Sequence, residues 1–262
     1  RMRMTVLATM AALLLAGPVS AAQPASGPAE SLPAATQPAD LLSGLTRPDQ
    51  TMTLVQWAVL LTVLAAAPAV GVLVTSFTRI AVVLGLLRQA LATQQLPPNQ
   101  VLFGLALLMT LAVMSPVIGD LYQQALEPYL AGRIAREQAF GAAQARIRAF
   151  MIGQIETAGN SQDVYVFLDD KLARREDLTW SDVPTLSLIP AYAISELKVA
   201  FHMGFRIFLP FLVVDLLVAS VLTSMGILML PPVLVSLPLK LLLFVLADGW
   251  HLVAGTLMRS FA

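Results

Sequence analysis

The sequence predicts an all-α protein that passes through a membrane several times, and three observations support that fold class. Hydrophobic residues make up 57% of the 262 residues, and the mean hydropathy is +0.76. Charged residues make up only 12%, roughly half of their share in soluble domains. Long apolar runs with isolated charges recur along the chain. This composition excludes a disordered chain, a nucleic-acid binder with a basic face and almost any soluble enzyme.

Charge and cysteine content restrict the chemistry further. The chain has 16 basic residues, 16 acidic residues and no cysteine, so it offers no disulfide, thiolate zinc site or cysteine nucleophile. Ten acids and seven bases fall between Asp120 and Asp182, where the net charge is −3. We expect residues 120–185 to form an aqueous, mainly helical region, in which Ser161 can cap a helix that runs through Leu172.

The N-terminal residues have the pattern of a secretory signal peptide. Arg1 and Arg3 precede an 11-residue apolar stretch, which is too short to span a bilayer of about 30 Å. Small residues around Ala21 fit a cleavage site, so residues 1–21 are expected to be removed; a retained signal anchor is the alternative. Five prolines among alanine, serine and glycine then predict a flexible linker over residues 22–52.

Residues 53–119 are expected to form a first apolar helical hairpin. Residues 53–78 hold no charge and are long enough to span a bilayer, with a kink expected at Pro68. The helix should continue beyond Arg79 with one apolar face, until a pair of prolines ends it. A second uncharged run follows over residues 101–119. The apolar face consists of Ile80, Val83, Leu84, Leu87 and Leu91.

Residues 186–262 are expected to form a second apolar hairpin. Its arms should be broken by Pro190, Pro210 and Pro238, because proline lacks an N–H and clashes with the preceding helical turn. Residues 226–232 supply the turn between the two arms, since glycine permits unusual backbone angles and two prolines stop the helix.

Charge also indicates an orientation. A cleaved signal peptide places the mature N-terminus outside the cytoplasm. Arg79 and Arg88 lie in a stretch, 79–99, that has no acid, which suits the cytoplasmic side under the positive-inside rule. Residues 120–185 would then be periplasmic, and the 226–232 turn would lie on the cytoplasmic side.

Three blocks of the sequence are long and carry charges at unusual positions. They are 75–102 (TSFTRIAVVLGLLRQALATQQLPPNQVL), 189–205 (IPAYAISELKVAFHMGF), and 209–215 (LPFLVVD) with 231–232 (PP) and 237–250 (LPLKLLLFVLADGW). These blocks closely resemble the FliP/SctR family of type III secretion export gate subunits. The resemblance covers most of residues 54–120 and 186–261.

The resemblance implies a subunit of an export gate rather than an enzyme. Family members assemble with FliQ and FliR into a helical, pore-forming complex, pentameric in the flagellar subunit, which carries unfolded flagellar proteins out of the cytoplasm. It also implies kinked helical hairpins, a place in the bacterial inner membrane within the flagellar basal body, and contacts with other export subunits and lipid. No cofactor, metal or nucleic acid is expected. The signal peptide and linker favour the flagellar branch over the injectisome homologue.

Four polar residues of the second hairpin are candidate contact residues. Lys198, His202 and Arg206 recur every four residues and form a basic stripe, while Glu196 lies on another helix face. Isolated charges in apolar helices usually face a partner or a water-filled cavity. We interpret the four as subunit contacts or pore lining; the alternative is a wet segment beside the membrane.

Asp215 and Lys240 lie at equal depth in the second hairpin, because each is roughly 18–20 Å from its tip at 1.5 Å per residue. An unpaired charge at that depth would cost on the order of several kcal/mol, so we expect the two to pair, within or between subunits. The alternative is that each points separately into water. Asp248 and His251 could pair locally, and a packing or capping role is preferred to chemistry.

The tip of the second hairpin is a candidate pore gate. The corresponding family loop is methionine-rich and seals the closed pore, and Ile227, Leu228 and Met229 stand at its positions here. Only one methionine is therefore kept. Apolar loops from several copies that converge on an axis would close a pore by excluding water. The alternative is a tip that rests in lipid or against a partner.

Motif searches find no catalytic or metal-binding set in the sequence. Glu196 and His202 lack the spacing of a zinc helix, and neither a nucleophile elbow nor a P-loop is present. Besides an export gate, a proton-coupled small-solute transporter stays open, for which Asp215 is the strongest candidate carboxylate. An intramembrane enzyme ranks last, because no nucleophile or metal set supports it.

Overall fold

The computed structural model describes residues 48–261 except 94–95, 176 and 228, and the regular structure of these residues is entirely helical. This confirms the predicted all-α class; the predicted signal peptide and most of the linker lie outside the described residues. The chain divides into two compact units, 1–59 and 60–262, and the packing given below is that of the second. The helices are α3 (Pro48–Leu73), α4 (Phe77–Ala90), α5 (Asn99–Leu121), the π-helical turn η1 (Tyr122–Leu126), α6 (Glu127–Leu130), α7 (Arg136–Thr157), the 3₁₀ turn η2 (Ser161–Phe167), α8 (Asp170–Ala173), α9 (Thr185–Ser224), α10 (Pro232–Leu246) and α11 (Gly249–Arg259).

The first apolar segment folds as two helices, and Pro68 does not separate them. Helix α3 runs through Pro68, and the break comes after Leu73. There, the Thr75 hydroxyl donates to the Val72 carbonyl at 3.1 Å, which satisfies one of the carbonyls that a helix end leaves without a partner. The expected continuation beyond Arg79 is thus a separate helix, α4.

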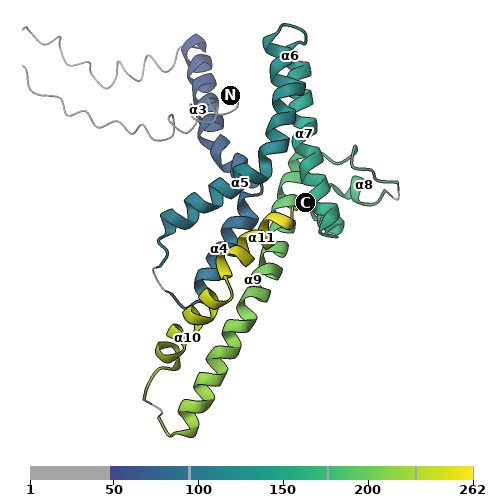
Figure 1. The fold of residues 1–262 in the computed structure, drawn as a ribbon. Coiled ribbons are helices and arrows are strands. Elements are labelled where there is room, and N and C mark those ends of the chain that lie inside the picture. Colours follow the sequence, from purple (N-terminus) through teal and green to yellow (C-terminus); the bar gives the residue numbers. More distant parts are fainter. Residues whose placement is uncertain (1–47, 94–95, 176, 228, 262) are drawn as a thin grey trace, which may run out of the picture. The chain divides into compact units, whose positions relative to one another are not determined.

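The amphipathic character of α4 was predicted correctly. Its apolar face packs against α5 and α9 and forms part of the larger hydrophobic core; Figure 1 shows α4 beside α9. The predicted face residues are at most 4% exposed: Ile80, Val83, Leu84, Leu87 and Leu91.

The charged region 120–185 is largely helical, but its second predicted helix is absent. The prediction of a helix from Ser161 through Leu172 was wrong: the chain forms η2 and then the short α8. Ser161 caps nothing, and Leu168, with φ −89° and ψ 148°, is extended and separates the two turns. A smaller hydrophobic core joins α7, η2 and the start of α9.

Helix α9 is continuous over 40 residues, although Pro190 and Pro210 lie inside it. The prediction that these prolines break the arm was wrong. Contacts with α4, α7, η2 and α10 support α9, and such packing outweighs the hydrogen bonds that two prolines remove. Figure 1 shows α10 lying alongside the distal part of α9 as the second arm of a hairpin.

The turn of this hairpin forms where the sequence predicted it. Gly226 has φ +74°, and its N–H donates to the Thr223 carbonyl at 3.0 Å. The Ile227 N–H donates to the Leu222 carbonyl at 2.9 Å. This pair of hydrogen bonds is a Schellman motif, which requires a left-handed residue and therefore favours glycine.

The last arm is bent, but not at its proline. Helix α10 runs through Pro238, contrary to the prediction, and α11 then departs at 64°. The bend lies at Asp248, whose φ is +49°. A Cβ on Gly249 would lie 2.2 Å from the Phe244 ring, so only glycine lets the chain turn this tightly over that ring.

The chain is a membrane protein by the length and composition of its helices. Three segments are long and apolar enough to span a membrane: Val55–Leu73, Asn99–Leu130 and Thr185–Ser224. The bent pair of α10 and α11 adds a fourth if it counts as one span. None of the Val55–Leu73 window is buried inside the chain, so its apolar side chains are available to lipid or to another protein.

Close packing of α4 on α9 generates a stability prediction. A Cβ on Gly204 would lie 2.2 Å from Leu86 Cδ1 and 3.1 Å from Leu86 Cβ. Gly204→Ala should therefore lower the free energy of unfolding by about 1–3 kcal/mol through overpacking, measured by thermal unfolding in detergent.

The matched control is Gly85→Ala on α4, where an added Cβ meets nothing within 4 Å. It should be neutral or stabilising, because alanine favours helix over glycine by about 1 kcal/mol. Adding Leu86→Ala to the Gly204→Ala variant should reduce the overpacking and recover part of the lost stability. Equal destabilisation by the two glycine substitutions would contradict the packing argument.

Candidate functional site

A fully buried ion pair joins α4 to α9. Arg79 Nε donates to Glu196 Oε2 at 2.8 Å and Arg79 Nη2 donates to Glu196 Oε1 at 2.6 Å. The two side chains are 2% and 0% exposed. Two parallel N–H···O bonds fix both the distance and the angle between the planes of the groups, so the pair sets the axial position of α4 on α9.

The remaining donors of the same guanidinium reach two further segments. Arg79 Nη1 donates to the Ser260 carbonyl at 2.7 Å, and Nη2 donates to Gln154 Oε1 of α7 at 3.1 Å. The Phe261 ring lies 4.0 Å from Arg79 Cζ, which is the geometry of a cation–π contact. One arginine therefore ties together α4, α7, α9 and the residues that follow α11.

Polar groups next to this cluster are also paired. The Tyr192 hydroxyl donates to the Thr75 carbonyl at 3.1 Å, in the break between α3 and α4. Asn160 Nδ2 donates to Ser195 Oγ at 3.0 Å, between η2 and α9. Buried polar groups in low dielectric are costly unless they are bonded, and these bonds hold the start of α9 against both of its neighbours.

The geometry changes the interpretation of two residues. Glu196 was expected at a subunit contact or a pore, but its side chain has no exposed surface because Arg79 and the core enclose it. Arg79 was counted as a charge of a cytoplasmic loop, yet it is a buried helical residue. The charge argument for orientation is therefore left with Arg88, which bonds Asn99.

The basic stripe on α9 splits into paired and unpaired members. Lys198 forms an ion pair with Asp163 of η2. His202 and Arg206 are exposed, and neither has an ion-pair partner among the described residues. A subunit contact or pore lining thus stays a prediction for these two.

The structure brings Asp215 and Lys240 together within one chain. Lys240 Nζ donates to Asp215 Oδ2 and Ser236 Oγ donates to Asp215 Oδ1, both at 2.6 Å. Lys240 is 3% exposed, and Asp215 is 37% exposed. Residues 236 and 240 are one turn apart on α10, so both reach the same carboxylate and fix the register of the hairpin.

The other residues singled out in the sequence lie at the surface. A packing or capping role was expected for Asp248; it precedes α11, but its side chain makes no capping hydrogen bond, so the capping part of that prediction is wrong. In the tip loop, Ile227 is 40% and Met229 is 97% exposed. Leu228, the third residue of the predicted gate, lies outside the described residues.

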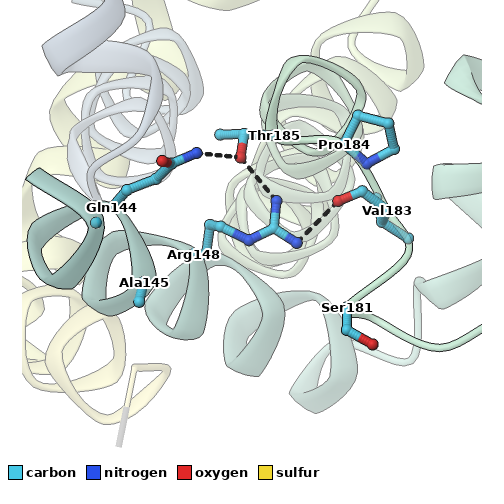
Figure 2. A pocket seen from close by; sticks show the side chains of 8 residues that line it. Gln144, Ala145, Arg148, Ser181, Val183, Pro184 and Thr185 are labelled. Carbon is cyan, nitrogen blue, oxygen red and sulfur yellow. Dashed lines mark hydrogen bonds between the residues drawn. The ribbon is translucent and has the colours of Figure 1, made fainter. Parts of the chain in front are cut away.

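A pocket of about 420 Å³ lies between α7 and the start of α9. Arg148 crosses it and donates to Thr185 Oγ1 and to the Trp180 and Val183 carbonyls at 2.8–2.9 Å. Figure 2 shows Gln144 reaching the same Thr185 hydroxyl. Arg148 thereby orders the turn that starts α9. No cluster of side chains suited to hold a metal ion is found among the described residues.

Long apolar helices that enclose a buried ion pair define an all-α membrane protein. The FliP family model matches residues 60–257, so the chain belongs to the FliP family. This confirms the resemblance that the sequence predicted.

The chain is similar to curated relatives over most of its length. It is 46% identical over 208 residues to the flagellar biosynthetic protein FliP of Bacillus subtilis, covering 79% of this chain and 91% of the relative. It is 47% identical over 212 residues to that of Caulobacter vibrioides, covering 80% and 77%. For the protein of Pectobacterium carotovorum the identity is 46%, with 81% of each chain covered.

One signal for Arg79 was present in the sequence. Arg79 lies four residues before Val83, on the apolar face of α4, and a charge on a buried face must find an opposite charge inside the protein. Its partner is 117 residues away, and no local pattern identifies a partner at that separation.

The buried pair generates a prediction of non-additivity. Arg79→Met should lower the free energy of unfolding by about 3–5 kcal/mol, because it leaves the Glu196 charge buried without a counter-charge. The double variant Arg79→Met/Glu196→Met should lose less than Arg79→Met alone, since it leaves no such charge. Thermal or denaturant unfolding in detergent measures both.

Arg136→Met is the control, because Arg136 is 82% exposed and pairs only with its neighbour Glu137. It should change stability by less than about 1 kcal/mol. A double variant that is less stable than Arg79→Met would show that the charge left behind is not the origin of the loss.

Proposed function

We propose that this protein is a core subunit of the flagellar type III protein export gate, through which unfolded flagellar proteins leave the cytoplasm. The observation that carries the proposal is the family match over residues 60–257, with relatives called flagellar biosynthetic proteins at 42–47% identity. The names of these relatives are those of flagellar proteins, which supports the flagellar gate over the injectisome homologue.

Exposed apolar surface supports an assembled state. Large hydrophobic side chains that are at least half exposed recur on α3, α9 and α10, and apolar areas of this extent serve lipid or protein contacts. The proposed partners are further copies of this chain, FliQ and FliR. The proposed location is the bacterial inner membrane, with residues 120–185 and the N-terminus on the periplasmic side.

A second proposal concerns the tip of the α9–α10 hairpin: we propose that this loop, residues 226–232, closes the pore. Met229 and Ile227 are exposed at the end of the hairpin, and the Schellman motif at Gly226 holds the loop in a fixed direction. Apolar side chains from several copies would exclude water and ions without any bond between them.

The transporter alternative is weakened by the surroundings of Asp215. A proton-coupled carboxylate would have to act alone, and Asp215 accepts hydrogen bonds from both Lys240 and Ser236. A carboxylate that fixes the register of the hairpin through these two bonds does not act alone, which favours a structural role for it over proton transfer.

The proposed function predicts complementation. In a flagellated bacterium that lacks its own family member, this chain should restore secretion of flagellar proteins into the medium, and tagged chain should co-purify with FliQ and FliR. Arg79→Met should fail in both measurements because its fold is weakened. Normal membrane levels of wild-type chain with no secretion and no co-purification would reject the gate proposal.

The proposed gate predicts leakage. A triple variant in which Ile227, Leu228 and Met229 are each replaced by glycine should leave co-purification unchanged. It should make the membrane permeable to ions and small solutes, because the apolar seal is lost. Dye uptake by intact cells measures this. The control is Leu186→Gly, also exposed at 85% but at the other end of α9. An assembled triple variant with a tight membrane would rule out this loop as the seal.

A further inference from the structure

Unpaired charges of opposite sign lie on two separate surfaces of the second hairpin. His202 and Arg206 lie on the exposed face of α9, and Asp248 lies at the bend between α10 and α11. Among the described residues, none of these side chains takes part in an ion pair. The other charges near them do: Lys198, Asp215 and Lys240 all have partners in the chain.

Apolar side chains surround the charges on both surfaces. Phe201, Phe205 and Leu209 flank Arg206 and are 57%, 63% and 44% exposed. Beside Asp248, Val245 and Leu246 are 73% and 77% exposed. A charge within an apolar surface is costly to place in lipid and is usually matched by an opposite charge. The α9 surface around Arg206 therefore requires a negatively charged partner, and the surface around Asp248 requires a positively charged one.

The two surfaces also lie at nearly the same level along α9. Two contacts tie the returning arm to α9 and set this level. Phe211 packs on Phe244, with ring centroids 6.4 Å apart. Glu196 and Ser260 meet on the Arg79 guanidinium.

Counted from the first contact, Arg206 is five residues from Phe211 on α9, and Asp248 is four residues from Phe244 on the returning arm. At 1.5 Å per residue the two lie within about one helical turn, or about 5 Å, of the same level. The 64° departure of α11 comes only after this stretch, and the second contact keeps the arm beside α9 beyond it.

Copies of one chain that sit in a membrane share the same orientation and similar depth. Groups at one level on two different surfaces of the chain then face each other across a head-to-tail contact between neighbouring copies. We propose that the α9 face around Arg206 of one copy packs against the α10–α11 bend of the next, with Arg206 paired to Asp248 of that copy. The inference rests on the proposed assembly of several copies and names the contact within it.

Lipid headgroups are the competing occupant of the α9 face, and the observations favour a second copy. Phosphate would satisfy Arg206, but it would leave the Asp248 surface without a cationic partner, whereas a second copy matches both surfaces. The exposed Phe201 and Phe205 beside Arg206 also suit a protein contact, because large aromatic side chains and arginine are enriched in interface centres.

Cross-linking between two differently tagged copies tests the contact. The chain has no cysteine, so one copy can carry Leu209→Cys and the other Val245→Cys. These residues lie three positions from Arg206 and Asp248, are 44% and 73% exposed, and leave both charges in place. A short bis-maleimide reagent suits the site, because an arginine–aspartate pair holds backbones farther apart than a disulfide allows.

The matched control replaces Leu209→Cys by Leu216→Cys, which is 62% exposed. It lies seven residues further on, hence on nearly the same face of α9 but about 10 Å deeper. We expect the Leu209→Cys/Val245→Cys pair to give at least ten times more mixed dimer than the control pair. Equal yields, or no mixed dimer while the two tagged copies still co-purify, would overturn the contact and leave the proposed function standing.

Charge reversal supplies a second readout. Arg206→Glu and Asp248→Arg should each reduce co-purification of two tagged copies, and the double variant should recover a substantial part of the loss. A double variant no better than the worse single one would reject the pairing. If Arg206→Glu leaves co-purification intact but lowers retention in vesicles with anionic lipid, the arginine faces headgroups and the inference is wrong. Tagged wild-type copies that never co-purify would refute the assembly itself.

Discussion

The enclosed guanidinium of Arg79 is the constraint on which the rest of the structure depends. Helix α4 has only 14 residues, yet it lies against α5 and α9. Apolar contacts alone would allow it to slide or rotate, because hydrophobic burial has no direction. The bidentate bond to Glu196 and the bond to Gln154 remove that freedom, so the pair specifies position more than it adds stability.

A second polar tie acts in the same way at the other end of the long helix. Asp215 accepts from Lys240 and Ser236, which holds α10 in one register on α9. Between the two ties, glycine allows close approach: Gly204 next to Leu86, and Gly249 next to Phe244. Helix α9 is therefore held by two charge pairs and by close packing between them, and its outer face is free for other contacts.

The folded chain leaves an unusually large share of its apolar surface uncovered. Within the described residues, the side chains of Val55–Leu73 are not buried in the chain, and only 11% of an apolar 18-residue window within Thr185–Ser224 is buried. The buried charges Arg79, Glu196 and Lys240 are paired inside the chain, whereas the outer apolar faces have no partner in one chain. Such a division fits a protein whose fold is completed by lipid and by neighbouring subunits.

The sequence by itself determined the features that depend on short-range patterns. Composition gave the membrane class, helical spacing gave the buried face of α4, and Gly226 with two prolines gave the turn. Equal distance from that turn also brought Asp215 and Lys240 to one depth, because a hairpin converts sequence distance into height. The FliP family was recognised from blocks of residues that carry charges at unusual positions.

Only the tertiary structure decided what depends on contacts between distant segments. Whether Pro190 and Pro210 break α9 is set by the helices packed against it, not by the prolines themselves. Glu196 looked like a surface charge because its partner is 117 residues away. The failure of Ser161 to start a helix has the same origin: η2 packs against α9, and long-range packing outweighs a local capping preference worth only about 1 kcal/mol.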